Sequence, residues 1–281
     1  MSLIAGHLAL ICEARIHDSE SHYCCFYRSV LCEEAGMALF ELCDVTVSYS
    51  DLLSPQSDGP TSRGEDVSKA DRASQQSSVP PVNDVSLALD AGCIYDLTGP
   101  SGSGKTTLLR ACARLLPLQG GTMLLDGQDF RTFEPTEWRQ RIALVPQKAT
   151  LIPGTVRDNL LLPWTLTVRE SAPRPKDDYL EQCLEDAKLE VGLSRNAAQL
   201  SGGQAARVAL LRVLVTKPQV LLLDEVDASL DDESARAVGN MIVRFVGNKA
   251  CALRIRHRPN DGLAKGTHHL EAGKLTYSEN A

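Results

Sequence analysis

The sequence lacks long apolar runs, regularly spaced cysteines and an excess of basic residues. No run approaches the roughly 18 apolar residues that a membrane-spanning helix needs, so we do not expect this chain to cross a bilayer by itself. The nine cysteines include no Cys-x-x-Cys pair, which favours free thiols in a reducing compartment over a disulfide framework. The net charge of −7 argues against DNA or RNA as the main partner, because nucleic-acid-binding surfaces usually carry a basic excess.

The composition predicts a globular domain with two segments that do not belong to its core. Hydrophobic residues make up 43% of the 281 residues and charged residues 23%, as in ordinary folded proteins. Residues 1–36 are interpreted as a disordered tail or a mis-assigned start, with translation beginning at Met37. Residues 37–281 are expected to form one domain, in which residues 50–81, rich in Ser, Pro, Gly, Asp and Gln, form a flexible insertion.

Apolar periodicity predicts strands that alternate with helices after residue 39. Strands are expected over residues 39–49, 82–92, 93–99, 141–147, 219–225 and 251–257, with a short hairpin over 120–130. Helices are expected from the glycine-rich loop to about residue 116, over much of 155–193, and over 200–215 and 232–246. This alternation predicts an α/β fold with a mainly parallel sheet.

A glycine-rich loop between a buried strand and a helix carries the first chemical signal. It reads GPSGSGKTT and fits the P-loop pattern of a glycine, four residues, then Gly-Lys-Ser/Thr. Its glycines allow successive N–H groups to turn toward phosphate oxygens, helped by the positive end of the following helix. Lys105 is expected to reach the β- and γ-phosphates, and Thr106 to offer its hydroxyl to Mg²⁺. The predicted nucleotide contacts here are Gly99, Pro100, Ser101, Gly102, Ser103, Gly104, Lys105, Thr106 and Thr107.

Two acids follow the apolar strand VLLL, at the edge of the predicted sheet where ligands bind. Asp224 is predicted to hold the magnesium ion, directly or through water. Glu225 is predicted to polarise the attacking water as general base. The alternative is that the two acids only open a turn.

The pentapeptide LSGGQ, residues 200–204, presents a second stretch of bare backbone at a helix start. Ser201, Gly202 and Gly203 form a second phosphate-binding surface in a chain with one P-loop. Two facing copies explain this, if each lends the surface to the nucleotide held by the other. The alternative is a simple helix N-cap.

Together these motifs resemble those of the ATP-binding cassette (ABC) ATPases, over about residues 39–277. The matching stretches are GPSGSGKTT, LVPQ ending at Gln147, LSGGQ, VLLLDE, ASLD at residues 228–231, and RIRHRP around His257; Tyr49 stands where the family places an aromatic residue. The resemblance implies a P-loop NTPase fold with a RecA-like core, an antiparallel β subdomain, and a helical subdomain at about residues 150–200.

The resemblance also implies a role for each matching residue, with ATP and Mg²⁺ as the bound cofactors. Gln147 would contact Mg²⁺ and the attacking water, and His257 would bond the γ-phosphate. Tyr49 would stack on adenine, Asp231 would communicate across a dimer, and the signature residues Ser201, Gly202, Gly203 and Gln204 would contact nucleotide. The alternatives are that His257 belongs to a solvated basic run and that Tyr49 is only a strand-edge residue.

Besides the insertion at 50–81, which is the largest departure, two stretches depart from the family pattern. After LSGGQ the chain reads Ala205-Ala206-Arg207, where the family usually has Gln-Gln-Arg or Lys-Gln-Arg. After Glu225 it reads Val226-Asp227, where Pro-Thr is common. We expect the loss of a polar side chain at Ala206 to weaken nucleotide-driven pairing, and neither change to remove a group that carries chemistry.

Within the family, the stretch PQKATLIPGTVRDNLLLPW is similar to stand-alone bacterial ATPase subunits assigned to iron export. That likeness implies a polytopic permease on a separate chain, a second ATPase subunit, most simply an identical copy, and a place at the inner face of the cell membrane. The runner-up is a soluble ABC ATPase that acts on a ribosome or DNA complex. A small-molecule kinase or GTPase is a third option, which leaves LSGGQ unexplained.

Overall fold

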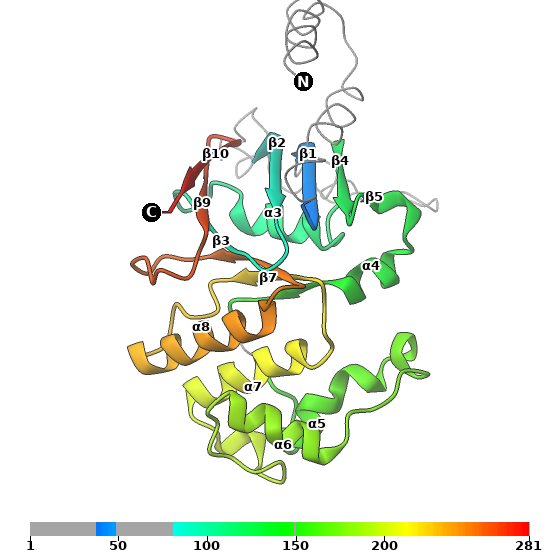
Figure 1. Cartoon of the computed structure of the whole chain (residues 1–281), viewed down its shortest axis with the longest axis vertical. Helices are drawn as coiled ribbons and strands as arrows, with labels where there is room; N and C mark the ends of the chain where they lie inside the picture. Colours follow the sequence, from blue (N-terminus) through cyan, green and yellow to red (C-terminus); the bar gives the residue numbers. More distant parts are fainter. Residues whose placement is uncertain (1–37, 49–80, 149, 281) are drawn as a thin grey trace, which may run out of the picture. The chain divides into compact units, whose positions relative to one another are not determined.

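The structure is a computed structural model that describes residues 38–48, 81–148 and 150–280. The predicted tail at 1–36, all but the last residue of the predicted insertion at 50–81, and Tyr49 lie outside the described residues. The described chain is built from two sheets, with helices on both faces of the larger one (Figure 1).

The larger sheet has six strands in the order β10-β9-β3-β8-β7-β6. Its strands are β3 (Ile94–Thr98), β6 (Ile142–Val145), β7 (Val220–Asp224), β8 (Cys251–Ile255), β9 (Gly266–Glu271) and β10 (Lys274–Glu279). All neighbours in this sheet run parallel except β9 and β10. The apolar residues of β7 are fully buried, as expected for a parallel strand covered on both faces.

The smaller sheet is antiparallel and has four strands in the order β2-β1-β4-β5. Its strands are β1 (Phe40–Val47), β2 (Val82–Leu89), β4 (Gly120–Leu125) and β5 (Gln128–Asp129). Burial alternates along β2, as in a sheet with one face on the core. The turn Asp126-Gly127 has positive φ at both residues, 51° and 71°, which suits a tight hairpin and confirms the one predicted over 120–130.

The helices divide between the two faces of the larger sheet. They are α3 (Lys105–Cys112), α4 (Pro135–Arg141), α5 (Val156–Leu161), α6 (Asp177–Asp186), α7 (Gly202–Leu214) and α8 (Asp232–Val246). One core joins α3 to both sheets and surrounds the fully buried Trp138. The other core joins α7 and α8 to the opposite face of the larger sheet and to α5 and α6 (Figure 1).

The segment of residues 150–200 is helical, as the sequence predicts, but in short pieces. A capping box between Thr155 and Asp158 starts α5, and 3-10 turns at Leu162–Thr165 and Thr167–Arg169 follow it. Asn159 is fully buried, and its side chain bonds main-chain atoms of Ile152 and Thr155. These bonds satisfy the buried amide and fix the loop that leads from β6 to α5.

Three expectations about the elements were wrong. The strand expected over 251–257 is present as β8, but no strand was expected after it, whereas β9 and β10 follow and extend the sheet beside β3. The predicted helix to residue 116 ends at Cys112, and Arg114 has a positive φ of 54° that a helix cannot continue. Helix α4 was not expected at all. The α/β class with a mainly parallel sheet is confirmed.

The added strand β9 carries an unusual buried histidine. His268 is 4% exposed, and its ring lies 5.7 Å from that of Tyr95 and 5.0 Å from that of Tyr277, centroid to centroid. Neither ring nitrogen has a hydrogen-bond partner among the described residues. Burial lowers the pKa of His268 to about 4, because the protonated ring would be desolvated.

Candidate functional site

The predicted site residues gather at the carboxyl ends of four adjacent parallel strands. The P-loop of residues 99–107 follows β3, Gln147 follows β6, Glu225 follows β7 and His257 follows β8. These strands are neighbours in the order β3-β8-β7-β6, so residues far apart in sequence meet at one sheet edge. This edge is where open α/β sheets bind their ligands.

The backbone of the P-loop has conformations and contacts that require glycine. Gly104 is the N-cap of α3 with φ of 100°, and a Cβ there would collide with the carbonyl oxygen of Pro81. A Cβ at Gly99 would collide with the carbonyl oxygen of Leu270. The following helix leaves its first N–H groups without intrahelical partners. A tight turn of this kind before a helix start suits an anionic ligand.

Two polar groups buried in the loop fit a phosphate ligand. Lys105 is 7% exposed, and its Nζ donates to the carbonyl oxygens of Gly99 at 2.8 Å and Pro100 at 2.9 Å. No acidic side chain of the described residues forms an ion pair with it. The Ser103 hydroxyl oxygen is buried without a hydrogen-bond partner among those residues. Buried charges and hydroxyls of this kind are costly unless partnered, and phosphate oxygens would partner both.

The remaining predicted P-loop residues take two kinds of position. Pro100, Ser101 and Gly102 are exposed on the loop, whereas Thr107 is buried in α3 and Thr106 is half-buried.

Thr106 and Asp224 form a pair of hard oxygen donors beside the P-loop. The Thr106 hydroxyl donates to Asp224 Oδ1 at 3.1 Å. Burial raises the pKa of Asp224, and the nearby Glu225 carboxylate adds to this, against the hydrogen bond from Thr106. A hydroxyl and a half-buried carboxylate are ligands that Mg²⁺ accepts. These two residues therefore fit the magnesium ion that the sequence predicts.

Glu225 lies between the two other predicted catalytic residues. Its Oε2 accepts a hydrogen bond from Gln147 Nε2, and its Oε1 contacts His257 Nε2, both at 2.8 Å. The Glu225 side chain is 22% exposed and that of His257 48%. Gln147, predicted as a metal ligand, bonds Glu225 rather than Thr106 or Asp224. The result is an oriented carboxylate, open to water, that can accept a proton.

The backbone of Glu225 is also unusual. Its φ is 50°, in the left-handed region that costs energy for a residue with a Cβ. Its N–H donates to the carbonyl oxygen of Ile255 in β8 at 3.2 Å. This bond ties the turn after β7 to the strand that leads to His257.

The signature residues 200–204 form the start of α7. Ser201 and Gln204 make a capping box, in which Gln204 N donates to Ser201 Oγ at 3.2 Å and Ser201 N donates to Gln204 Oε1 at 3.0 Å. A Cβ at Gly203 would collide with the Ser234 hydroxyl, whereas a Cβ at Gly202 would have open space around it. The alternative that LSGGQ forms a helix N-cap is therefore correct in part. Of its two glycines, Gly202 is the one whose backbone is exposed.

The starts of α7 and α8 lie side by side. Asp231 is the N-cap of α8 and accepts bonds from the Ser234 N–H at 2.8 Å and hydroxyl at 3.0 Å. The same hydroxyl approaches Gly203. The signature and the 228–231 stretch therefore meet through Ser234.

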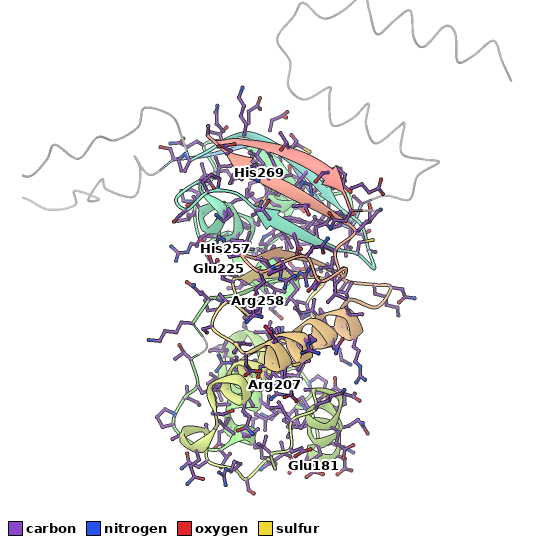
Figure 2. All side chains as sticks on the ribbon, turned by 90° about the vertical axis from the view of Figure 1, so that its left-hand side faces the viewer. Glu181, Arg207, Glu225, His257, Arg258 and His269 are labelled. Atoms are coloured by element: carbon purple, nitrogen blue, oxygen red, sulfur yellow. The ribbon has the colours of Figure 1, made fainter. Side chains whose placement is uncertain are left out.

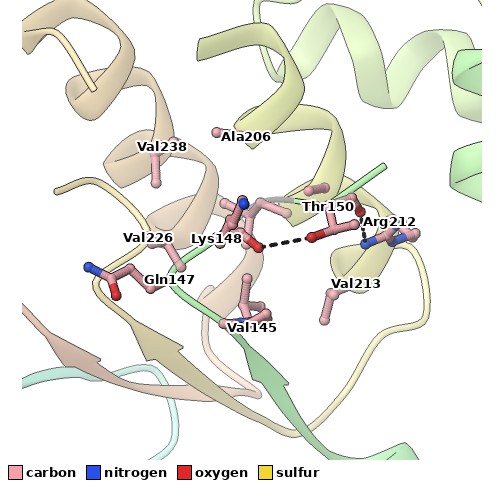
Figure 3. A pocket seen from close by; sticks show the side chains of 12 residues that line it. Val145, Gln147, Lys148, Thr150, Ala206, Arg212, Val213, Val226 and Val238 are labelled. Carbon is pink, nitrogen blue, oxygen red and sulfur yellow. Dashed lines mark hydrogen bonds between the residues drawn. The ribbon is translucent and has the colours of Figure 1, made fainter. Parts of the chain in front are cut away.

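A cavity of about 70 Å³ lies between α7 and the loop after β6 (Figure 3). Gln147, Ala206 and Val238 are among its lining residues. Across it, Arg212 Nη2 donates to the carbonyl oxygen of Thr150 at 2.9 Å.

Sequence reasoning missed the structural role of the arginines around His257. Arg254 and Arg256 are 3% and 9% exposed, and Arg258 is half-buried. Each forms ion pairs with aspartates, and Asp227 is one of them. The alternative that this basic run is simply solvated is therefore wrong for its arginines. The signal that could have shown it is the alternation of Arg254 and Arg256 with Ile255 at the end of the buried strand β8.

Comparison with known proteins agrees with these motifs. The family model described as ABC transporter matches residues 82–228. The chain is 39% identical over 173 residues to the probable iron export ATP-binding protein FetA of Escherichia coli K12, covering 61% of this chain and 75% of that protein.

Two other relatives are named for import. The spermidine/putrescine import ATP-binding protein PotA of Chromobacterium violaceum is 38% identical over 189 residues, 63% of this chain. The methionine import ATP-binding protein MetN 1 of Pseudomonas syringae is 36% identical over 172 residues, 59% of this chain. The chain spans about half the length, 51%, of each of these two proteins.

Among the described residues, no helix is both long enough and apolar enough to span a membrane. The family match covers more than half of the chain, and its P-loop, signature and acidic strand end lie inside that match. The chain belongs to the ABC transporter family and carries the ATP-binding ATPase domain of that family.

Proposed function

We propose that this chain binds ATP with Mg²⁺ and hydrolyses it as a separate subunit that drives a membrane permease. The observation that carries the proposal is the Glu225 carboxylate, held at 2.8 Å by both Gln147 and His257 beside the P-loop. An oriented carboxylate next to a phosphate-binding loop is suited to activate water for attack on a γ-phosphate.

Each residue has a distinct part in this reaction. The P-loop amides and Lys105 hold the phosphates, and Thr106 and Asp224 hold Mg²⁺. When bound, Mg²⁺ offsets charge on the phosphate oxygens. Glu225 accepts the proton of the attacking water, and His257 donates a hydrogen bond toward the transferred phosphoryl group. Electrostatic stabilisation of this kind supplies much of the catalysis in phosphoryl transfer.

Gln147 is proposed to contact Mg²⁺ and the attacking water, and also to link the site to the rest of the chain. Its amide bonds Glu225, and the loop that follows is tied to α7 by Arg212 and to α5 by Asn159. A shift at Glu225 therefore has a connected route into the helical subdomain. We propose that the permease contacts this subdomain, which would place the chain at the inner face of the membrane.

We propose further that two copies face each other, each closing the other's site with its signature. Ser201 and Gly202 are exposed at the start of α7, whose positive end favours a phosphate of the opposing nucleotide. Tyr49 remains the predicted adenine contact. The proposed cargo is a metal ion moved outward, following the relative named for iron export.

The dimer proposal is tested by trapping ATP with Glu225→Gln and measuring mass by light scattering. With ATP and Mg²⁺ the mass should double. Adding Gly202→Asp should keep the protein monomeric, because an acid there favours the helix start but repels phosphate. Gly192→Asp is the matched control, since Gly192 is also exposed with open space around it. A Gly202→Asp protein that still dimerises with ATP would refute the signature contact.

The partner proposal is tested by purifying the tagged chain from detergent-solubilised membranes. A multi-span membrane protein should accompany it. Recovery with ribosomes or DNA instead would support the runner-up, a soluble ABC ATPase, over a transporter subunit.

A further inference from the structure

His257 stands between two arginines that both reach back to the segment after Glu225. This segment, residues 227–232, runs from the turn after β7 to the start of α8. Arg256 and Arg258 donate four hydrogen bonds to it, one from Arg256 and three from Arg258. Glu225, His257 and Arg258 lie close together in Figure 2.

Arg256 holds the beginning of the segment through a buried ion pair. Its Nε donates to Asp227 Oδ2 at 3.0 Å, and the two side chains are 8% and 10% exposed. A second nitrogen, Nη1, lies 2.7 Å from Asp261 Oδ2 without hydrogen-bond geometry. Removing one partner of a buried pair leaves an uncompensated charge, so the two side chains constrain each other strongly.

Arg258 holds the segment along its whole length. Its Nε donates to the carbonyl oxygen of Asp227 at 3.1 Å, its Nη2 donates to the carbonyl oxygen of Leu230, and its Nη1 donates to Asp232 Oδ1 at 2.8 Å. A planar guanidinium can satisfy three acceptors in one plane, which an ammonium group cannot do.

The contacts of Arg256 and Arg258 hold the main chain directly before and directly after His257. Among the described residues, the His257 ring has one hydrogen-bond partner, the Glu225 carboxylate, and the His257 side chain is 48% exposed. Its position relative to Glu225 therefore depends on the main chain that carries it. That main chain is held to residues 227–232 by the arginine before it and the arginine after it.

We propose that Arg256 and Arg258 are positioning residues that clamp His257 to residues 227–232, so that His257 and the start of α8 move together. The segment contains Asp231, the cap of α8, which meets the signature through Ser234. When a second copy displaces the start of α8, the clamp moves His257 with it. The proposal rests on the proposed function, since it needs His257 to act on ATP.

The test compares Arg258→Gln and Arg258→Lys with Arg114→Gln in steady-state ATP hydrolysis. Arg114 is the matched control because its Nη1 also donates to two carbonyl oxygens, those of Phe130 and Phe133, at 3.0 and 2.7 Å. It lies just beyond the C-terminal end of α3, whereas the P-loop precedes that helix.

We expect Arg258→Gln to lower kcat about tenfold or more while KM for ATP changes less than about twofold. Arg258→Lys keeps the charge and one or more of the bonds, and should recover part of kcat. Arg114→Gln should lower the melting temperature but leave kcat unchanged. The split between kcat and KM is the readout that a general loss of stability would not produce.

A second variant tests the Arg256 side of the clamp without leaving a buried charge. Asp227→Asn combined with Arg256→Gln removes both charges and should fold better than either single change. Its kcat should nevertheless fall, with KM for ATP retained.

The clamp is overturned if Arg258→Gln hydrolyses ATP as Arg114→Gln does, or if both lose kcat equally. It is also overturned if KM rises while kcat is kept. Failure of the proposed function looks different, because then the unmodified chain hydrolyses no ATP, or Glu225→Gln hydrolyses it at the normal rate.

Discussion

The replacement of Glu225 by Gln removes one acceptor atom and a negative charge from the centre of the site. The Glu225 carboxylate bonds Gln147 and His257 at 2.8 Å each. An amide has nearly the same shape, and can still accept from Gln147 and donate to a neutral His257 nitrogen. The local geometry should therefore persist, although the amide cannot take a proton from water.

We expect Glu225→Gln to lower kcat strongly and to change the free energy of unfolding little. A positioned general base contributes about 10²–10⁴-fold to a rate, which corresponds to about 3–5 kcal/mol of barrier. We expect kcat for ATP hydrolysis to fall by this factor. The free energy of unfolding should change by less than about 1 kcal/mol. The Gln amide can form a hydrogen bond in place of each of the two that the carboxylate forms, and one hydrogen bond between neutral groups contributes about as much net free energy as another.

The assay is phosphate release at saturating ATP, together with ATP affinity and a urea unfolding curve. Glu137→Gln is the matched control, because it removes a half-buried acid that pairs with Arg141 at 2.7 Å in α4. Its kcat should be that of the unmodified protein. A Glu225→Gln protein that turns over ATP within about twofold of normal would remove Glu225 from the role of base.

Two further predictions follow from buried groups. Lys105→Ala should weaken ATP affinity and abolish hydrolysis, measured by nucleotide binding and phosphate release; unchanged activity would refute the P-loop assignment. His268 binds a proton in the unfolded chain near pH 6.5 but in the folded chain only near pH 4, so the free energy of unfolding should fall by up to about 3 kcal/mol as pH drops through this window. Urea unfolding of His268→Phe should lose that pH dependence, and an unchanged slope would contradict it.

The chemistry of the site could be predicted because it lies in short motifs with fixed neighbours. The P-loop, the acids after β7 and the signature each combine a strand end or helix start with particular residue types, and these local patterns have physical causes. The rule that carboxyl ends of parallel strands meet at one edge then predicts that Gln147, Glu225 and His257 converge. The structure brings these three within hydrogen-bond distance.

The strands that follow β8 could not be predicted from the local sequence pattern alone. Strand β9 pairs with β3, from which it is separated by most of the chain, so its place depends on a long-range contact. Residues 266–271 read GTHHLE, whose two histidines suggest a polar surface strand. One of them, His268, is buried between aromatic rings, and only the tertiary structure distinguishes it from the exposed His269.

The same limit explains why the sequence gives the departure at Asp227 no structural role, and predicts only that it removes no group that carries chemistry. In the sequence, an acid where Thr is common after the catalytic strand changes no group that touches nucleotide. In the structure that acid is buried against Arg256, 29 residues away in the chain. A charge at either position alone would be costly, whereas the two together are compatible with the core. Asp227 and Arg256 are therefore best understood as one feature, and in the proposed clamp the position of His257 relative to Glu225 depends on this pair.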